Sequence, residues 1–211
     1  QIYEIQRDTG ERVSNVVIMG SGEPLDNYDN VMDFLEIIHS KEGNNLSHRH
    51  ITLSTCGIVD KIYKLAEEKL QITLAVSLHA PNDEIRQNTM PVARKYDYNS
   101  LIKAAKYYAD TTKRRVTFEY ALIKGVNDGE DNAKELASRL KGIMCHVNLI
   151  PVNDVKENNY VRSTEENIKN FAEILQRLGI ETTVRRKLGS DINAACGQLR
   201  KSYNERKIKE E

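Results

Sequence analysis

Residues 71–83 read QITLAVSLHAPND, a run of mostly apolar residues that ends in small and polar ones. The run is short, contains β-branched side chains and is bounded by polar residues, which favours a buried strand. A helical pattern precedes it at about 59–69, and another follows at about 100–111. A strand between two helices is typical of βαβ units, whose strands pair in parallel.

Five more runs of the same kind occur along the chain. They are NVVIMG (15–20), HITLST (50–55), RRVTFEYALI (114–123), CHVNLIP (145–151) and ETTVRR (181–186). Further helical patterns lie between them at about 28–39, 128–140 and 164–178. The sequence therefore predicts an α/β fold with a parallel sheet. Six strands are too few for a complete eight-stranded barrel, so a partial barrel and a doubly wound sheet both remain open.

The composition is that of a globular protein. Hydrophobic residues make up 39% and charged residues 29% of the 211 residues, and 31 basic residues balance 31 acidic ones. Net charge thus gives no support to nucleic-acid binding, which would need a local basic patch. No stretch approaches the roughly 18 apolar residues of a membrane span and no signal peptide is visible, so we expect a cytoplasmic protein.

We expect one domain over residues 1–211, with a charged tail at 201–211. No repeat, low-complexity tract or linker divides the chain. It opens on a pattern that resembles the second half of an amphipathic helix, with Ile2 and Ile5 on one side. We therefore interpret the chain as a piece of a longer protein, truncated on its N-terminal side.

Small and polar residues follow each of the six runs. The carboxyl ends of parallel strands meet at one rim of the sheet, where ligands bind. The sequence thus predicts one pocket built from six loops. These are GSGEPLDN (20–27), STCG (54–57), SLHAPND (77–83), EYALIKGVND (119–128), PVND (151–154) and RRKLGSDINAACG (185–197).

Each loop holds residues that can bind a ligand but that also have an ordinary structural use. Glu23 of GSGEP suits a ligand ammonium group better than a phosphate, although a tight turn explains the same glycines and proline. Ser54 and Thr55 can donate hydrogen bonds or cap the next helix. His79 can act as a base, but a lone histidine at a strand end is more often structural.

The three cysteines, Cys56, Cys145 and Cys196, form no CxxC pair, which argues against a disulfide framework or a cysteine metal site. Cys196 is the one with chemical promise, because Ala195 and Gly197 leave room around its sulfur, as a reactive thiol requires. A small buried hydrophobe is the ordinary alternative.

The loop motifs together resemble the radical S-adenosylmethionine adenine methyltransferases of ribosomal RNA. These enzymes methylate carbon 2 of an adenine in 23S rRNA and tRNA, or carbon 8 in an antibiotic-resistance relative. The resemblance extends from about residue 16 to 199, and six motifs in one order are far more specific than any one alone. They are GSGEPLDNYDNV, ITLSTCGIV, LAVSLHAPND, RVTFEYALIKGVND, VNLIPVN and GSDINAACGQL.

The resemblance implies a partial (β/α)6 TIM-like barrel, with its first strand missing here, that holds a 4Fe–4S cluster and S-adenosylmethionine. Cys196 matches the cysteine that is methylated and then carries the carbon to the base as an S-methylcysteine intermediate. Implied partners are 23S rRNA, tRNA and an electron donor such as flavodoxin or ferredoxin. By position, the matching cofactor contacts are Gly22, Glu23, Ser54, Ser77, Leu78, His79 and Asn153.

A radical mechanism suits such a substrate, because the adenine carbon has no nucleophilic lone pair for an ordinary methyl transfer. One S-adenosylmethionine would methylate the thiolate, and a radical from a second would activate the methyl group. The target adenine must leave its stack to reach the pocket. A basic group could meet RNA phosphates, or could simply be solvated surface. Its members are Arg114, Arg115, Arg185, Arg186 and Lys187.

The sequence departs from the family in one important respect. The cluster-binding CxxxCxxC loop is absent, and three dispersed cysteines cannot replace it, since a cluster needs three or four convergent thiolates. We expect no metal ligands in this chain and no turnover by the isolated polypeptide. Alternatives are the carbon 8 methyltransferase, a non-catalytic RNA-binding barrel, and a barrel lyase acting on a phosphorylated substrate.

Overall fold

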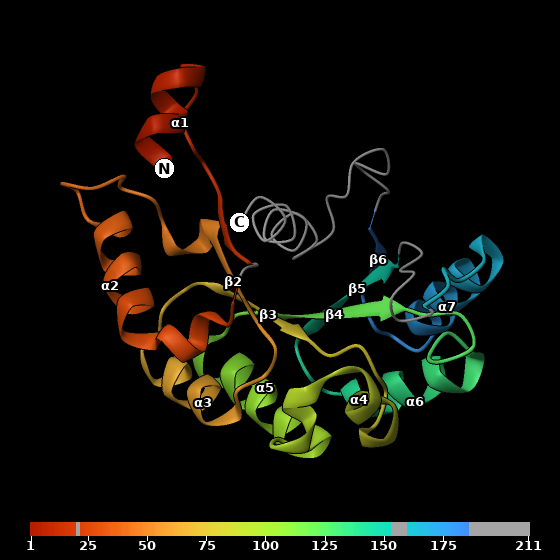
Figure 1. Cartoon of the computed structure of the whole chain (residues 1–211). Coiled ribbons are helices and arrows are strands. Elements are labelled where there is room, and N and C mark those ends of the chain that lie inside the picture. The colour runs from red at the N-terminus through yellow and green to blue at the C-terminus, as the bar shows by residue number, and fades with distance from the viewer. Residues whose placement is uncertain (20–21, 153–159, 186–211) are drawn as a thin grey trace, which may run out of the picture.

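A computed structural model of the chain describes residues 1–19, 22–152 and 160–185. Six parallel strands form one sheet whose order is the order of the sequence (Figure 1). A doubly wound sheet reverses its strand order at a switch point, and this sheet does not, so the partial barrel is confirmed. The strands are β1 (Val16–Ile18), β2 (Ile51–Thr55), β3 (Thr73–Ser77), β4 (Val116–Leu122), β5 (Cys145–Pro151) and β6 (Thr182–Val184).

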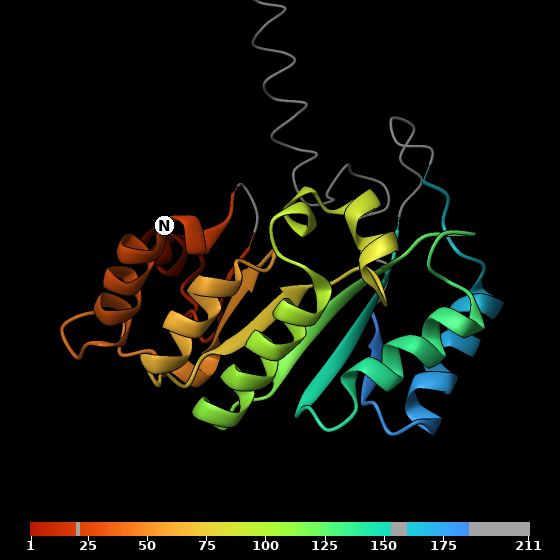
Figure 2. The same ribbon diagram turned by 90° about the horizontal axis from the view of Figure 1, so that it is seen from below.

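The helices that connect the strands lie along one face of the sheet and leave its concave face open (Figures 1 and 2). The N-terminal helix α1 (Ile2–Thr9) lies apart from them. No described helix is long and apolar enough to cross a membrane. The connecting helices are α2 (Tyr28–His39), α3 (Val59–Glu67), α4 (Asp83–Thr89), α5 (Tyr98–Thr112), α6 (Glu130–Leu140) and α7 (Glu165–Arg177), with short 3-10 helices at Pro24–Asn27 (η1), His48–His50 (η2) and Pro91–Arg94 (η3).

Strand alternation separates an apolar face from a polar one. Side chains such as Leu53, Val76 and Phe118 are fully buried against the helices. The intervening positions face the concave side, because successive strand residues point to opposite faces. Parallel sheets usually read as apolar on both faces. Here most concave positions are small or polar, with Val17 and Ile150 as apolar exceptions. The polar ones include Thr52, Ser54, Thr73, Ser77, Thr117, Glu119, His146, Asn148 and Thr183.

The predicted helices are present, with corrected starts. Helix α5 begins at Tyr98, two residues before the expected start, because Asp97 caps it: its Oδ1 accepts a hydrogen bond from the Ser100 N–H at 2.9 Å. Thr164 caps α7, and its Oγ1 accepts from the Asn167 N–H at 3.2 Å. The stretch after β3 contains one more helix than the sequence pattern predicts, α4, whose first turn is capped by Asn82.

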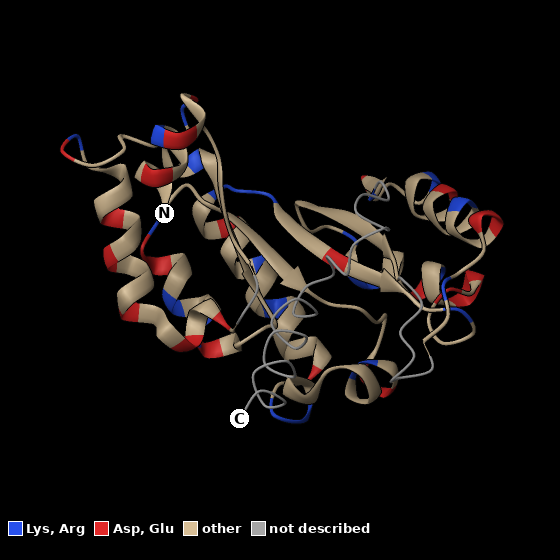
Figure 3. Ribbon diagram, turned by 45° about the horizontal axis from the view of Figure 1, so that its top comes forward, with Lys and Arg blue, Asp and Glu red and all other residues tan. Residues whose placement is uncertain are grey.

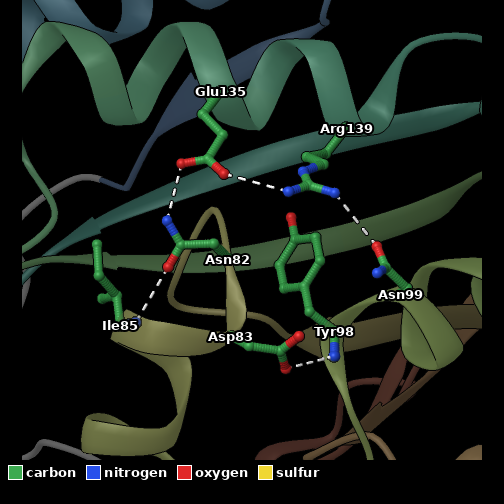
Figure 4. Close-up of polar contacts among 7 residues, drawn as sticks. All are labelled: Asn82, Asp83, Ile85, Tyr98, Asn99, Glu135 and Arg139. Atoms are coloured by element: carbon green, nitrogen blue, oxygen red, sulfur yellow. Dashed lines mark hydrogen bonds and ion pairs between the residues drawn. The ribbon is translucent and has the colours of Figure 1, made fainter.

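Helix α4 is held against α5 and α6 by polar side chains (Figure 4). Asn82 donates from Nδ2 to Glu135 Oε2 at 2.8 Å, and Asp83 accepts from the Tyr98 N–H at 2.7 Å. Arg139 extends the network by bonding both Glu135 and Asn99. A seven-residue helix has little stability of its own, so these contacts fix its position.

Candidate functional site

Glu23 joins the loops that follow β1 and β2. Its Oε1 accepts a hydrogen bond from the Leu25 N–H at 3.0 Å, and its Oε2 accepts one from the Cys56 N–H at 2.7 Å. Gly22, just before it, has a φ of 148°, which favours glycine. A carboxylate has about four lone-pair sites, so Glu23 can still accept from a ligand ammonium group. The backbone bonds hold it ready in one orientation.

The two cysteines in the described part of the chain are not reactive thiols. Burial and the neighbouring Glu23 carboxylate raise the pKa of the half-buried Cys56 to about 12. Burial raises the pKa of Cys145, at the start of β5, to about 11. Nucleophilic thiols have a lowered pKa instead. Cys196 lies outside the described residues.

Arg86 of α4 connects the ends of β2 and β3, a role that no sequence motif indicates. The side chain is fully buried, and its Nη2 donates to the backbone oxygens of Cys56 at 2.8 Å and Ser77 at 3.4 Å. Space beside it is tight: a Cβ on Gly57 would lie 2.9 Å from Leu101 Cδ1 and 3.2 Å from Arg86 Nη2. Cys56 is thus held by an anion at its N–H and a cation at its carbonyl.

The turn after β3 is fixed by its neighbour β4. The N–H groups of Leu78 and His79 donate to the Glu119 backbone oxygen at 3.0 and 3.2 Å. His79 has a left-handed φ of 58°, and its Nδ1 accepts from the Ala121 N–H at 3.0 Å, which leaves the ring proton on Nε2. Leu78 is fully buried, so only its backbone is available to a ligand.

Asn127 connects the turn at His79 to the loop after β4 by side-chain hydrogen bonds. It is fully buried, and its Nδ2 donates to the backbone oxygens of His79 at 2.9 Å and Ala121 at 2.7 Å. Its Oδ1 accepts from the Ile123 N–H at 2.8 Å. Asn127 belongs to the loop EYALIKGVND (119–128), in which the sequence does not single it out. The structure gives it three side-chain bonds between two loops.

Ser54 and Thr55 have different roles, where the sequence left open whether they bind a ligand or cap the next helix. Thr55 Oγ1 accepts from the Gly57 N–H at 3.1 Å within the turn, and α3 has no side-chain cap. Ser54 lies on the concave face in register with Ala75. Glu23, Ser54, Ser77 and His79 therefore belong to three neighbouring strand ends, as predicted, whereas Asn153 lies outside the described residues.

The described members of the predicted basic group do not lie together. Arg114 and Arg115 precede β4, at the opposite rim from the loops, where Arg114 donates to Thr73 Oγ1 at 3.2 Å and Arg115 pairs with Glu181. Arg185 follows β6 at the loop rim. Figure 3 shows both charge signs interspersed over the helices. Arg186 and Lys187 are outside the described residues.

His79 gives the site a measurable pH dependence. Burial, with a smaller effect of Arg86, lowers the pKa of His79 to about 4 from 6.5, so the unfolded chain binds this proton more readily than the folded one. The neutral His79 side chain therefore contributes fully to the free energy of unfolding above pH 6.5. As the pH falls from 6.5 to about 4, this free energy decreases by up to about 3 kcal/mol. Urea unfolding at several pH values measures this loss.

His79→Asn is the matched variant, because asparagine tolerates a left-handed φ and does not titrate. Its unfolding free energy should depend less steeply on pH between 6.5 and 4 than that of the wild type. His48 and His146, whose pKa values burial also lowers, leave a residual slope. Equal slopes for the two proteins would contradict the assignment.

The described residues do not fit an iron–sulfur cluster. No group of three or more His, Cys, Asp or Glu side chains among them is placed to hold a metal ion. Cys56 follows β2 whereas Cys145 begins β5, so the two thiols lie at opposite rims of the sheet. A nucleoside fits better, since the concave face offers hydroxyls, amides and carboxylates from adjacent strands.

The comparisons with known proteins agree with this geometry. The model of the radical SAM superfamily matches residues 1–137. A protein of Clostridium novyi (strain NT) named probable dual-specificity RNA methyltransferase RlmN is 60% identical over 203 residues, which are 96% of this chain and 59% of that protein. The Clostridium tetani protein of the same name is 59% identical over 210 residues, or 60% of its length. The chain thus spans about three fifths of these relatives.

Solved structures give the same result. A radical SAM methyltransferase from Sphaerobacter thermophilus superposes with a TM-score of 0.88 at 49% identity, over 92% of this chain and 57% of that one. A domain of pyruvate-formate lyase-activating enzyme from Bacteroides vulgatus, at 19% identity over 82% of this chain and all of that one, shares the fold with a TM-score of 0.64. The expected partial barrel is confirmed, and the chain belongs to the radical SAM superfamily.

Proposed function

We propose that this chain is the barrel domain of an RNA methyltransferase that methylates carbon 2 of an adenine in 23S rRNA and tRNA. The observation that carries the proposal is identity of about 60% over nearly the whole chain to proteins named dual-specificity RNA methyltransferase. The polar rim built from Glu23, Ser54 and Ser77 supports it. An RNA substrate favours a cytoplasmic protein, and the radical chemistry would need an electron donor such as flavodoxin or ferredoxin.

S-adenosylmethionine would supply the methyl group and the radical that activates it. Gly22 and Glu23 would bind its amino group, with the carboxylate oriented by the Leu25 and Cys56 N–H groups. His79 would offer a neutral Nε2–H donor, since its Nδ1 is already an acceptor. The remaining proposed contacts are Ser54, Ser77, the Leu78 backbone and Asn153.

Cys196 is the proposed covalent carrier. Its thiolate would take up a methyl group from one S-adenosylmethionine, which leaves as S-adenosylhomocysteine. The S-methyl group would then lose a hydrogen atom to the cofactor-derived radical, and the resulting carbon radical would add to the adenine ring. The carbon–sulfur bond must break afterwards to free the methylated base. A sulfur arm can deliver carbon to a ring position that lacks a lone pair. The residues beside it in the sequence are small, two alanines before it and a glycine after it, and would leave the arm room to move.

The test is nucleoside analysis of RNA by mass spectrometry. RNA from cells that lack the gene, and from cells carrying it as wild type, Cys196→Ala or Cys145→Ala, is digested and compared. We expect 2-methyladenosine with the wild type and with Cys145→Ala, whose thiol is buried at the far rim, and none with Cys196→Ala. Methylation at carbon 8, or 2-methyladenosine with Cys196→Ala, would refute the proposal.

We also propose that the 211-residue polypeptide alone has no turnover, because its three cysteines do not supply the thiolates of a cluster. Reconstitution with iron and sulfide should give no visible cluster absorbance. A chain that binds the cluster would overturn this expectation.

A further inference from the structure

The concave face carries a buried carboxyl that has no role in the proposed cofactor contacts. Glu119 lies in the middle of β4 and is 8% exposed. Its strand neighbours Phe118 and Tyr120 pack among the helices, so Glu119 faces the concave side. Glutamate is almost never buried without a partner or a function.

Glu119 belongs to a polar row that crosses four strands. In register, Ser77 of β3 pairs with Glu119, Glu119 pairs with Asn148 of β5, and Asn148 pairs with Thr183 of β6. Adjacent strands are about 4.8 Å apart, so side chains at paired positions on one face can contact the same small group. Glu119 therefore lies within one strand spacing of the proposed cofactor contact Ser77.

Hydrogen bonds fix one oxygen of this carboxyl and leave the other available. Oε2 accepts from Asn148 Nδ2 at 2.8 Å, and Thr183 Oγ1 donates to Asn148 Oδ1 at 3.4 Å. Within the described part of the chain, Oε1 has no hydrogen-bond partner. Because the backbone oxygen of Glu119 also holds the turn at Leu78 and His79, carboxyl and turn are fixed relative to each other.

The chemistry of the row selects its ligand. The concave positions of β2 to β5 include no Lys or Arg, so a phosphate here would meet a carboxylate whose charge only Arg185 of the described residues, just after β6, is placed to offset. A carboxylate beside a serine hydroxyl suits a ligand with adjacent hydroxyl groups. The ammonium group of the cofactor is already assigned to Glu23, which lies in the loop after β1, three strands away from β4.

We propose that Glu119 accepts hydrogen bonds from the ribose hydroxyls of the nucleoside cofactor and so makes the site selective for a ribonucleoside. This inference rests on the proposed function, because it requires a nucleoside at the ends of β3 and β4. Asn148 is then a positioning residue that orients the carboxyl without touching the ligand.

Calorimetry with the full gene product tests this inference with two ligands, S-adenosylhomocysteine and its 2′,3′-dideoxy analogue. We expect Glu119→Gln to weaken binding of S-adenosylhomocysteine about tenfold and Glu119→Ala about a hundredfold, which are typical losses for a hydrogen bond to a charged group. Binding of the dideoxy analogue should change less than about threefold, since the lost partner is missing from it. Thr117→Val, on the same face of β4 one row away, is the control and should leave both affinities unchanged.

Three other results of this binding experiment would each contradict the inference, and they can be told apart. Equal weakening of both ligands would mean that Glu119 supports the fold or meets the ammonium group, and the proposed function would stand. Unchanged binding of S-adenosylhomocysteine by both variants would exclude Glu119 from the site. A wild-type protein that binds neither ligand would refute the nucleoside site itself, and with it the cofactor assignment in the proposed function.

Discussion

Replacement of Arg86 by alanine is expected to lower the free energy of unfolding by about 3–5 kcal/mol, the sum of a lost buried side chain and lost hydrogen bonds. The change removes a fully buried side chain and leaves the backbone oxygens of Cys56 and Ser77 without their donor. Urea unfolding followed by circular dichroism measures the loss. Arg94→Ala, at an exposed position in η3, is the matched control and should change stability by less than about 0.5 kcal/mol.

Arg86→Met separates the two causes of the loss. Methionine restores most of the volume but donates no hydrogen bonds, so it should recover only part of the stability and remain about 2 kcal/mol below the wild type. Full recovery with methionine would mean that packing alone explains the arginine. A loss of less than about 1 kcal/mol in Arg86→Ala would contradict the structural role altogether.

Asn127→Asp is the second substitution with a large expected effect, about 4 kcal/mol of lost stability. The change is nearly isosteric, but it replaces the amide donor by an oxygen that faces the backbone oxygens of His79 and Ala121. Two buried acceptors then lose their donor, and a buried charge is repelled by both. The same unfolding measurement gives the loss, and it should shrink at low pH, where the introduced carboxyl is protonated.

Asn127→Ala and Asn99→Ala complete this comparison. The alanine at position 127 removes the three bonds without adding a charge, so we expect a smaller loss, about 2–3 kcal/mol. Asn99 is exposed, and its replacement should cost less than about 0.5 kcal/mol. If the aspartate variant is as stable as the alanine variant, the introduced carboxylate is not repelled by the backbone oxygens of His79 and Ala121, and the prediction is wrong.

Local patterns were enough to predict the sheet. Strand positions such as Leu53, Val76 and Phe118 alternate with small or polar residues, and a period of two residues is visible without knowledge of the fold. The polar loops after the strands could likewise be grouped at one rim, because parallel strands all end there. The resemblance added the choice of a partial barrel over a doubly wound sheet, which the consecutive strand order confirms.

The contacts that stabilise the loop rim could not be predicted from local sequence patterns. Arg86 bonds a carbonyl 30 residues earlier in the chain, and Asn127 bonds one 48 residues earlier. Buried polar bonds of this kind depend on which loops meet, and sequence spacing carries no signal for them. An arginine in a polar stretch is ordinarily assigned to the surface.

The basic group was a different kind of error. Arg114 and Arg115 precede a strand, whereas Arg185 follows one. In a parallel sheet, residues before and after strands lie at opposite rims, so the predicted topology already separated them. Grouping charges by residue type ignored the strand direction.

The six strands pair in the order in which a ribosome makes them. Each strand after β1 joins the strand that precedes it in the sequence, so its partner has already been synthesised when it emerges. None of the described strand pairs waits for a segment made much later, and the entropy cost of closing each loop stays small. Translation can therefore extend this sheet one βα unit at a time, with the growing edge always facing the newest part of the chain.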